Sequence, residues 1–218
     1  MSAHRDATSA AVKLDVLTSL QGIDKNHWNS LTDGNPFVSY GFLNNLETTN
    51  CLHPQGWYPQ HIVLRDNQNR LLAAMPLFVR DNSYGEFVFD WSWADAYQRA
   101  GGKYYPKLVT ASPFSPVSGP RLLVRDSEND KDTLRLSLVK AAINLCQKNN
   151  LSSWHSLFPA EEEIEYYQEC ELLIRLGYQY HWFNDGFGIF EDFLSTLKSK
   201  RLKEKKRERK TAKENDLI

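Results

Sequence analysis

The chain has few of the features that mark secreted, membrane-spanning or zinc-binding proteins. Its three cysteines, Cys51, Cys146 and Cys170, lie far apart in 218 residues and show no CxxC spacing. This usage argues against a disulfide framework or a zinc site and indicates reduced thiols in a cytoplasmic protein. No apolar run approaches the roughly 18 to 20 residues of a membrane helix, and the first residues lack the apolar core of a secretory signal. The sequence therefore predicts a cytoplasmic protein without a membrane span.

Common catalytic motifs are absent as well. The sequence contains no P-loop, no Ser/His/Asp or Cys/His arrangement for a nucleophile, and no metal-ligand spacing. His53 and His61 are too loosely placed to indicate a metal site. We therefore expect neither a metal nor a redox cofactor.

The composition is that of an ordinary globular protein, with 41% hydrophobic and 24% charged residues. The net charge of −1 hides an asymmetry, because residues 1–197 hold 16 Lys/Arg against 23 Asp/Glu whereas residues 198–218 hold 10 against 4. An acidic body of net charge −7 is thus followed by a basic tail of +6. This split is more informative than the net charge, since it marks the tail as a candidate interaction segment.

Hydrophobic periodicity predicts a mixed α/β domain with the element order β-α-α-β-β-β-α-β-α-β. We expect a disordered start over residues 1–11, the domain over 12–189, and a basic helix over 190–218 that leads to a second domain; the final DLI resembles the start of another strand. A loop after the third of three meander strands leads through KLVTA to RLLV (121–124). Strands are expected at 14–20, 57–66, 70–80, 86–93, 152–158 and 178–184, and helices at 24–31 (capped by Asp24), 39–49, 132–148, 161–177 and 190–215.

The stretch from Asp81 to Arg121 has the most unusual composition. Alternation over residues 86–93 places four aromatic side chains on one face of the expected strand. From composition alone, a half-buried strand with an aromatic core face is the more common explanation, but the long proline-rich return that follows favours a concave pocket with polar groups such as Asp95 and Tyr97 at its mouth. The four aromatic residues are Phe87, Phe89, Trp91 and Trp93.

Several long segments, in this order, closely resemble bacterial Fem-like N-acyltransferases of the GNAT superfamily, which are labelled as peptidoglycan biosynthesis or recognition proteins. The resemblance covers roughly residues 35 to 215. It implies a GNAT-like, largely antiparallel central sheet flanked by helices and ending in a long basic helix. The segments are NPFVSYGFLNNLE, SYGEFVFDWSWADAY, YYPKLVTASPFSPVSGPRLL, WHSLFP and YQYHWFNDGFGIFEDFLSTLKSKRLKEKKRERK.

The resemblance also implies a function. Characterised Fem transferases carry two GNAT-like halves and move an amino acid from aminoacyl-tRNA to an amine on a cell-wall precursor. The chain is then the N-terminal half, which contributes the acceptor pocket, while most of the second half is missing. Two alternatives stay open: a non-catalytic module that binds a cell-wall precursor or a protein, and a protein that binds nucleic acid through the basic helix.

The usual GNAT donor motif is not found. Acyl-CoA sites generally use (Q/R)xxGx(G/A), in which loop amides and a helix N-terminus hold the pyrophosphate. The segment RDSENDKD, which follows RLLV, has no glycine, and its acids would repel an anion. The segment QRAGGK (98–103) has two glycines but ends in Lys103, where the motif requires Gly or Ala. We expect that this half binds no CoA in the standard way, and that acyl-CoA or aminoacyl-tRNA is held by the absent half. The repelling acids are Asp126, Glu128, Asp130 and Asp132.

Acyl transfer to an amine needs a group that accepts the amine proton and groups that position the acceptor. We favour Asp95 as the base because it lies beside the aromatic stretch, and a lone histidine on a strand is more often a packed residue. Lys107 or Arg121 is a candidate partner for a carboxylate or phosphate, whereas SPVSGPR (115–121) equally suits a structural turn. The candidate bases are Glu86, Asp95, His155 and His181, and the candidate substrate-binding residues are Trp91, Trp93, Tyr97, Tyr105, Lys107, Ser118 and Arg121.

The basic helix has three interpretations that the sequence does not separate. It is a solvated charged face, a surface that binds a polyanion such as tRNA, or a surface that docks on acidic groups of a missing half or another subunit, which makes self-association plausible. Single-strand base stacking is not expected, because no aromatic residue interrupts the run. The candidate polyanion-binding residues are Lys205, Lys206, Arg207, Arg209 and Lys210.

Overall fold

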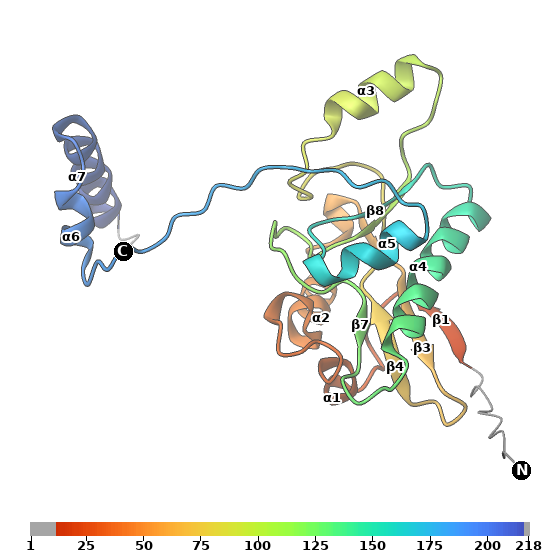
Figure 1. Ribbon diagram of the computed structural model, residues 1–218. Helices are drawn as coiled ribbons and strands as arrows, with labels where there is room; N and C mark the ends of the chain where they lie inside the picture. Colours follow the sequence, from red (N-terminus) through yellow and green to blue (C-terminus); the bar gives the residue numbers. More distant parts are fainter. Residues whose placement is uncertain (1–11, 216–218) are drawn as a thin grey trace, which may run out of the picture. The chain divides into compact units, whose positions relative to one another are not determined.

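The computed structural model describes residues 12–215, and the chain divides into two compact units, Met1–Arg175 and Leu176–Ile218 (Figure 1). The expectations for a disordered start over residues 1–11 and for a strand beginning at DLI concern residues outside the described range. Within residues 12–215, no helix combines the length and the apolar character needed to cross a bilayer.

The first unit is built on two four-stranded ladders in which every strand pair is antiparallel except β6 with β8. This confirms the mixed α/β fold with a largely antiparallel sheet. One ladder has the order β1-β3-β4-β7, with β1 (Lys13–Leu17), β3 (His61–Arg65), β4 (Leu71–Met75) and β7 (Leu123–Val124). The other has the order β2-β5-β6-β8, with β2 (Trp57–Pro59), β5 (Phe78–Arg80), β6 (Lys107–Thr110) and β8 (Trp154–Ser156).

The two ladders are halves of one kinked sheet. Gln60 alone separates β2 from β3, and two residues, Pro76 and Leu77, separate β4 from β5. The amide N–H of Gln60 donates to the carbonyl of Leu77 at 2.8 Å, which joins the ladders at the kink. The predicted strands 57–66 and 70–80 are therefore each broken once, and Pro76 contributes because it has no N–H to donate to a ladder.

Helices cover both faces of this sheet (Figure 1). Alternation along the strands explains why both faces are apolar: Ile62 packs in the cluster on the α4 side, whereas its neighbour Val63 packs in the cluster that contains Trp28 of α1, and all three are 0% exposed. Burial of side chains of this size stabilises the fold by about 1.5–3 kcal/mol each. The helices are α1 (Lys25–Asn29), α2 (Tyr40–Thr48), α4 (Lys131–Lys148) and α5 (Ile164–Glu169), with short 3-10 turns at Pro36–Val38, His53–Gln55 and Glu161–Glu163.

Local capping chemistry places several helix starts where they were predicted. The Asp24 carboxylate accepts the amide N–H groups of Asn26 and His27 at 2.9 Å and caps α1. Ser39 caps α2 in the same manner. The helix predicted for 161–177 is wrong in its second half, because α5 ends at Glu169 and Glu171 takes a left-handed backbone with φ of 59°.

The strand predicted for 86–93 does not exist. Phe87 and Phe89 have positive φ values of 60° and 49°, which a pleated strand does not tolerate, and α3 (Trp91–Arg99) begins inside the predicted range. Glu86 and Asp90 turn inward and the aromatic residues turn out to solvent, the reverse of the expected core face. The aromatic alternation therefore reflects two buried carboxylates rather than a buried aromatic face.

The second unit contains two helices, α6 (Phe190–Ser195) and α7 (Ser199–Glu214). The single helix predicted for 190–215 is wrong, because Lys198 is extended (φ −60°, ψ 147°) and the break lets α7 return against α6, with Arg209 lying 4.4 Å from the ring centroid of Phe190. The strand predicted for 178–184 is also wrong, since the described residues of this segment have no strand pairing.

Gly56 turns the chain into β2 with a left-handed backbone (φ 71°), and a Cβ atom there would overlap the side chains of Asp81 and Asn82. Gly56→Ala is therefore expected to cost about 1–2 kcal/mol from the backbone alone, plus the displacement of these side chains. Gly22→Ala is the matched control, because Gly22 (φ 89°) has open space around its Cβ position. Urea denaturation should show the larger loss for Gly56→Ala; equal losses would contradict the close approach.

Candidate functional site

The candidate site is built around four buried charges at one end of the two inner strands, β5 and β6, of the second ladder. Arg80 ends β5 and Lys107 begins β6, and the two are direct partners in the antiparallel register. Glu86 and Asp90 come from the loop before α3, and all four residues are at most 2% exposed. Two cations and two carboxylates balance, as buried charges must. We call the following set the Lys107 cluster: Arg80, Ser83, Glu86, Asp90, Tyr104, Tyr105 and Lys107.

Lys107 is the centre of the Lys107 cluster. Its Nζ donates to Ser83 Oγ at 2.9 Å, to Glu86 Oε2 at 2.8 Å and to Asp90 Oδ2 at 2.7 Å, which uses all three of its N–H groups. Tyr104 Oη donates to the same Asp90 oxygen at 2.7 Å, and Ser83 Oγ lies 2.8 Å from Tyr105 Oη. The ammonium group is thus bound within the protein and is not directed at a ligand.

Arg80 fixes the loop that carries the carboxylates. Its Nε donates to Glu86 Oε1 at 3.2 Å, and its other nitrogens donate to the carbonyls of Gln55 (2.8 Å) and Tyr84 (2.6 Å). The guanidinium also lies 3.8 Å from the ring centroid of Trp57. Backbone from before β2 and after β5 is therefore tied to one side chain.

The electrostatics of the Lys107 cluster keep its groups in fixed protonation states. Burial by itself would raise the pKa of Asp90, but hydrogen bonds from Lys107 and Tyr104 outweigh it and lower that pKa to about 2. Burial and the bond to Asp90 raise the pKa of Tyr104, so its hydroxyl stays protonated. Burial also raises the pKa of Glu86, against the opposing charge of Lys107.

His155 stands at the half-buried outer edge of the Lys107 cluster. It lies on β8, which runs parallel to β6, and its ring meets that of Tyr104 edge-on with centroids 6.1 Å apart. Its Nε2 is 2.9 Å from Ser153 Oγ. Burial, with the nearby charge of Lys107 as a second cause, lowers the pKa of His155 to about 4. His155 is therefore a neutral imidazole at physiological pH.

The structure brings five of the predicted site residues together. Glu86, Tyr105 and Lys107 belong to the Lys107 cluster, His155 contacts it through Tyr104, and the ring of Tyr97 on α3 lies 6.2 Å from that of Tyr104.

The remaining predicted residues lie apart from this group. Asp95, the favoured base, is exposed on α3 and pairs with Arg99 at 2.7 Å. Trp91 and Trp93 are exposed on the same helix, and His181 is exposed in the second unit. Each of these groups faces solvent, so none is desolvated as the chemistry requires.

Arg121 and Ser118 belong to the proline-rich return after β6. The Arg121 guanidinium donates to the carbonyls of Leu157 (2.9 Å), Pro120 (3.0 Å) and Val117 (2.6 Å). Arg121 is 1% exposed. These bonds brace the return against β8, whereas Ser118 is exposed on it. The structural-turn interpretation of 115–121 accounts for this geometry.

Sequence reasoning missed Arg80, Ser83, Asp90 and Tyr104. One signal was present for Arg80, because a charge that closes the apolar run LLAAMPLFV requires a buried partner. Glu86, which pairs with Arg80, and Asp90, which pairs with Lys107, follow within ten residues of Arg80, but the sequence does not show that both turn inward, since Phe87 and Phe89 take positive φ values there.

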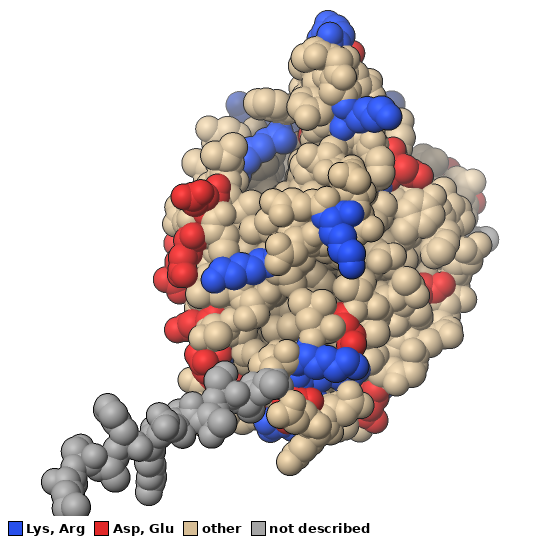
Figure 2. Space-filling view, turned by 90° about the vertical axis from the view of Figure 1, so that its right-hand side faces the viewer, with Lys and Arg blue, Asp and Glu red and all other residues tan. Residues whose placement is uncertain are grey.

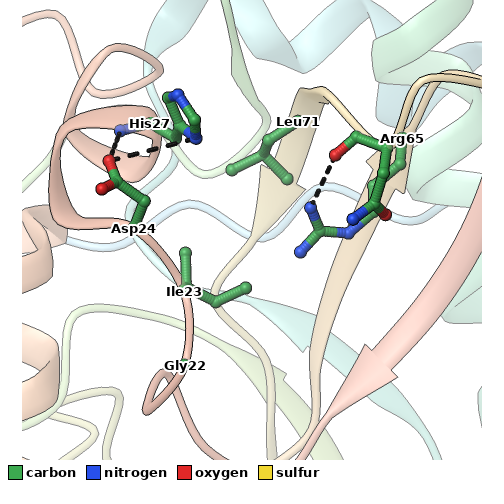
Figure 3. A pocket seen from close by; sticks show the side chains of 7 residues that line it. Gly22, Ile23, Asp24, His27, Arg65 and Leu71 are labelled. Atoms are coloured by element: carbon green, nitrogen blue, oxygen red, sulfur yellow. Dashed lines mark hydrogen bonds and ion pairs between the residues drawn. The ribbon is translucent and has the colours of Figure 1, made fainter.

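Two surface pockets lie elsewhere on the first unit. One of about 260 Å³ is shown in Figure 3, where Asp24 and His27 form one wall and Arg65, bonded to the Asn69 carbonyl at 3.1 Å, forms the other. It contains none of the predicted site residues. The second, of about 200 Å³, lies beside β7 and the start of α4 and is lined by Asp33, Asp126, Glu162 and Glu163 against Arg135. Among residues 12–215, no three His, Cys, Asp or Glu side chains gather as a metal site.

The His155 environment predicts how stability depends on pH. The folded-state pKa of about 4 lies below the ordinary value of 6.5, so the unfolded chain binds more protons between these values and stability falls as pH drops from about 6.5 to about 4. The loss is on the order of 2–3 kcal/mol, because water screens part of the half-buried ring. Denaturant titrations at several pH values should show this slope in the wild type, a flatter one in His155→Gln, and no flattening in the exposed-site control His27→Gln.

Comparisons with known proteins give the family. The family model described as FemAB-like, peptidoglycan biosynthesis/recognition, matches residues 19–218. The comparison with curated protein sequences finds no match. Among solved structures, the chain is similar to a Trypanosoma brucei acetyltransferase at 11% identity, with 79% of this chain and 100% of that chain covered and a TM-score of 0.44. It is also similar to an Acinetobacter baumannii aminoglycoside 6′-N-acetyltransferase at 11% identity, with 82% of this chain and 100% of that chain covered and a TM-score of 0.45. A ribosomal-protein-alanine N-acetyltransferase from Brucella melitensis biovar Abortus is similar at 12% identity, with 82% of this chain and 100% of that chain covered and a TM-score of 0.43.

These structural likenesses assign no activity to the chain. The family match, in contrast, covers almost the whole of it and confirms the resemblance found in the sequence. The chain belongs to the FemAB-like family of peptidoglycan biosynthesis and recognition proteins.

Proposed function

We propose that this chain forms the acceptor side of an N-acyltransferase that moves an acyl or aminoacyl group to an amine. Membership of the FemAB-like family supports the reaction class. The observation that carries the proposal is the neutral His155 at the half-buried edge of the Lys107 cluster, where its ring meets the ring of Tyr104. An unprotonated imidazole can accept the proton that the amine loses during acylation.

The proposed reaction is the transfer of an acyl group from a donor to an amine. The neutral amine nitrogen attacks the acyl carbonyl, the bond from the carbonyl carbon to the donor's oxygen or sulfur breaks, and the amine loses one proton. His155 accepts that proton and passes it to the leaving group or to water.

Elimination among the four candidate bases favours His155. The oxygens of Glu86 are held by Arg80 and Lys107, so this carboxylate is not available to an amine. Asp95 and His181 are exposed to solvent. His155 alone among them combines partial burial with a free-base form at neutral pH.

The Lys107 cluster has a positioning role in this proposal. Lys107 holds the carboxylates, and Asp90 in turn accepts a hydrogen bond from the hydroxyl of Tyr104, whose ring meets that of His155. Because its charges are neutralised internally, the Lys107 cluster supplies rigidity and not a charged contact to the substrate.

The family description supports an amine on a cell-wall precursor as the acceptor. For the donor we propose acyl-CoA or aminoacyl-tRNA, held outside this half. The acids around the pocket beside β7 support this, since they disfavour a pyrophosphate at the start of α4, where a GNAT donor loop would lie.

The test is direct. Protein is incubated with labelled aminoacyl-tRNA or acyl-CoA and a lysine-bearing cell-wall stem peptide, and amide product is measured by mass spectrometry. Product that depends on the peptide amine is the expected result. Saturable peptide binding without any product would instead favour the non-catalytic binding module and overturn the proposal.

A second candidate function is polyanion binding by α7. This helix carries nine Lys/Arg and three Glu, and the ion pairs Lys205–Glu208 (2.8 Å) and Lys210–Glu214 (3.6 Å) neutralise only part of the excess. We predict tRNA binding that weakens by roughly 10³-fold or more between 50 and 200 mM salt if six or more phosphates are contacted.

Neutralisation of Lys205, Lys206, Arg207, Arg209 and Lys210 to Gln should reduce both the affinity and its salt dependence. Matched exposed lysines on the first unit, Lys25, Lys140 and Lys148, provide the control. Filter binding that is unchanged by the five substitutions would eliminate this function.

A further inference from the structure

A set of aromatic side chains projects into solvent next to the candidate site. We call residues 84–103 the aromatic projection; α3 forms its centre and stands away from the sheet at the top of Figure 1. Ala94 is the one buried residue of that helix. Six large rings in the aromatic projection are between 44% and 66% exposed, namely Tyr84, Phe87, Phe89, Trp91, Trp93 and Tyr97.

This exposure is unusual for the surface of a protein that acts alone. Contiguous apolar patches on soluble proteins mark interaction sites more often than chance. A helix of nine residues that packs on little else is also marginal in water, where isolated helices below roughly 12–15 residues are rarely stable. Three of the rings contact one another, with ring centroids 5.6 Å apart for Phe89–Trp91 and 6.3 Å apart for Tyr84–Trp91. A partner that covers them would stabilise the helix.

We propose that the aromatic projection docks on the surface of an anionic lipid bilayer. Its shape is convex, which suits insertion into a fluid headgroup layer better than fitting to a preformed protein groove. Trp and Tyr combine an apolar ring with a polar atom and prefer the membrane–water interface for this reason. Phe87 and Phe89 add apolar area without a charge.

The charges of the aromatic projection fit an anionic surface. Arg99 and Lys103 are exposed at the end of α3 and after it, whereas Glu86 and Asp90 are buried and paired with cations. Asp95 is the one exposed acid of the aromatic projection, and Arg99 pairs with it at 2.7 Å. Figure 2 shows this lobe at the top as largely uncharged, with basic side chains toward its tip.

The charge of the first unit favours an approach to the bilayer through the aromatic projection. The first unit, residues 1–175, holds 16 Lys/Arg against 20 Asp/Glu, a net charge of −4, so as a whole it would be repelled by anionic lipid. The aromatic projection is instead net positive among its exposed charges. This inference concerns membrane attachment and does not depend on the acyl-transfer proposal.

The test uses the full chain and vesicles of defined composition. Protein is sedimented with vesicles of phosphatidylcholine alone or of phosphatidylcholine and phosphatidylglycerol in equal parts, and its Trp fluorescence is recorded. We expect binding to the anionic vesicles with a blue shift of the emission. Trp91→Ala/Trp93→Ala should reduce the partition coefficient at least tenfold.

Matched variants separate the contribution of the aromatic rings to vesicle binding from that of the basic side chains. Tyr178→Ala/Tyr180→Ala removes two aromatic residues that are 97% and 100% exposed in the second unit, and should bind as the wild type does. Arg99→Gln/Lys103→Gln should weaken binding to anionic vesicles by about fivefold for each charge removed, without affecting phosphatidylcholine vesicles. All these positions are exposed, so thermal unfolding should be nearly unchanged.

Three outcomes would overturn the proposal. They are no sedimentation of the wild type with anionic vesicles, equal sedimentation of Trp91→Ala/Trp93→Ala, and a dimer in analytical ultracentrifugation that this variant abolishes. The last would identify the aromatic projection as an interface between two copies. Amide formation in a detergent-free assay with soluble peptide is measured separately, so the two proposals fail independently.

Discussion

Replacing Lys107 with methionine is expected to lower the free energy of unfolding by about 3–5 kcal/mol, because the buried carboxylate of Asp90 loses its cation and that of Glu86 keeps only Arg80. Lys107 is 0% exposed and bonds Glu86 and Asp90 at 2.8 and 2.7 Å. Methionine fills the volume of the lysine stem, so the loss reports the charge and not a cavity. Chemical denaturation at pH 7 measures the effect.

Two further variants test the cause. Lys103→Met removes an exposed lysine four residues earlier and should change stability little. The double variant Lys107→Met/Asp90→Asn removes the lysine together with the carboxylate of Asp90, leaves the Arg80–Glu86 pair in place, and should recover part of the loss. If Lys107→Met were as stable as the wild type, the buried ion network would not hold the loop that precedes α3.

The second large effect concerns turnover. In the full reaction, His155→Gln is expected to reduce kcat/KM for amide formation by roughly 10²–10⁴, the usual contribution of a general base. Glutamine preserves a hydrogen bond to Ser153 Oγ but accepts no proton. Affinity for the acceptor should change little, so the loss should fall on kcat and not on KM.

Controls distinguish a chemical role from a structural one. His27→Gln alters a histidine on α1, remote from the Lys107 cluster, and should leave kcat unchanged. Ser153→Ala removes the hydroxyl next to His155 Nε2 and should shift the acid limb of the pH profile while retaining most turnover. A His155→Gln variant with wild-type kcat would remove the base from the mechanism.

Elements governed by local chemistry were predictable from the sequence. Asp24 caps α1 and Ser39 caps α2, close to the predicted starts of these helices. The amphipathic helix predicted over 132–148 appears as α4, Lys131–Lys148. Here the signal and its cause lie within a few residues of each other, so periodicity and capping rules suffice.

The stretch over 86–93 shows why other parts were not predictable. Aromatic and acidic residues alternate there, and a pleated strand satisfies that pattern as well as a loop does. The choice is made by Arg80 and Lys107, which draw Glu86 and Asp90 inward from positions 6 to 21 residues away in the chain. A two-residue period does not reveal which of its two faces has buried partners.

The sequence indicated the stretch in which most of the Lys107 cluster lies, but not which side chains form it or how they are paired. The stretch from Asp81 to Arg121 holds every member of the Lys107 cluster except Arg80, yet Asp95 was preferred for its place beside the aromatic residues and lies exposed beside Arg99. His155 was named as a candidate, but its importance follows from β8 pairing with β6, which brings it next to Tyr104. Parallel pairing across 45 residues leaves no local mark in the sequence.

The most direct test is an NMR titration of the protein with a lysine-bearing cell-wall stem peptide, observing the ring signals of His155 and His27. The acceptor site proposed here predicts saturable shifts at His155 and at the neighbouring Tyr104, with His27 unmoved. Saturable shifts confined to His27 and Arg65, at the pocket of Figure 3, with His155 unchanged, would contradict it.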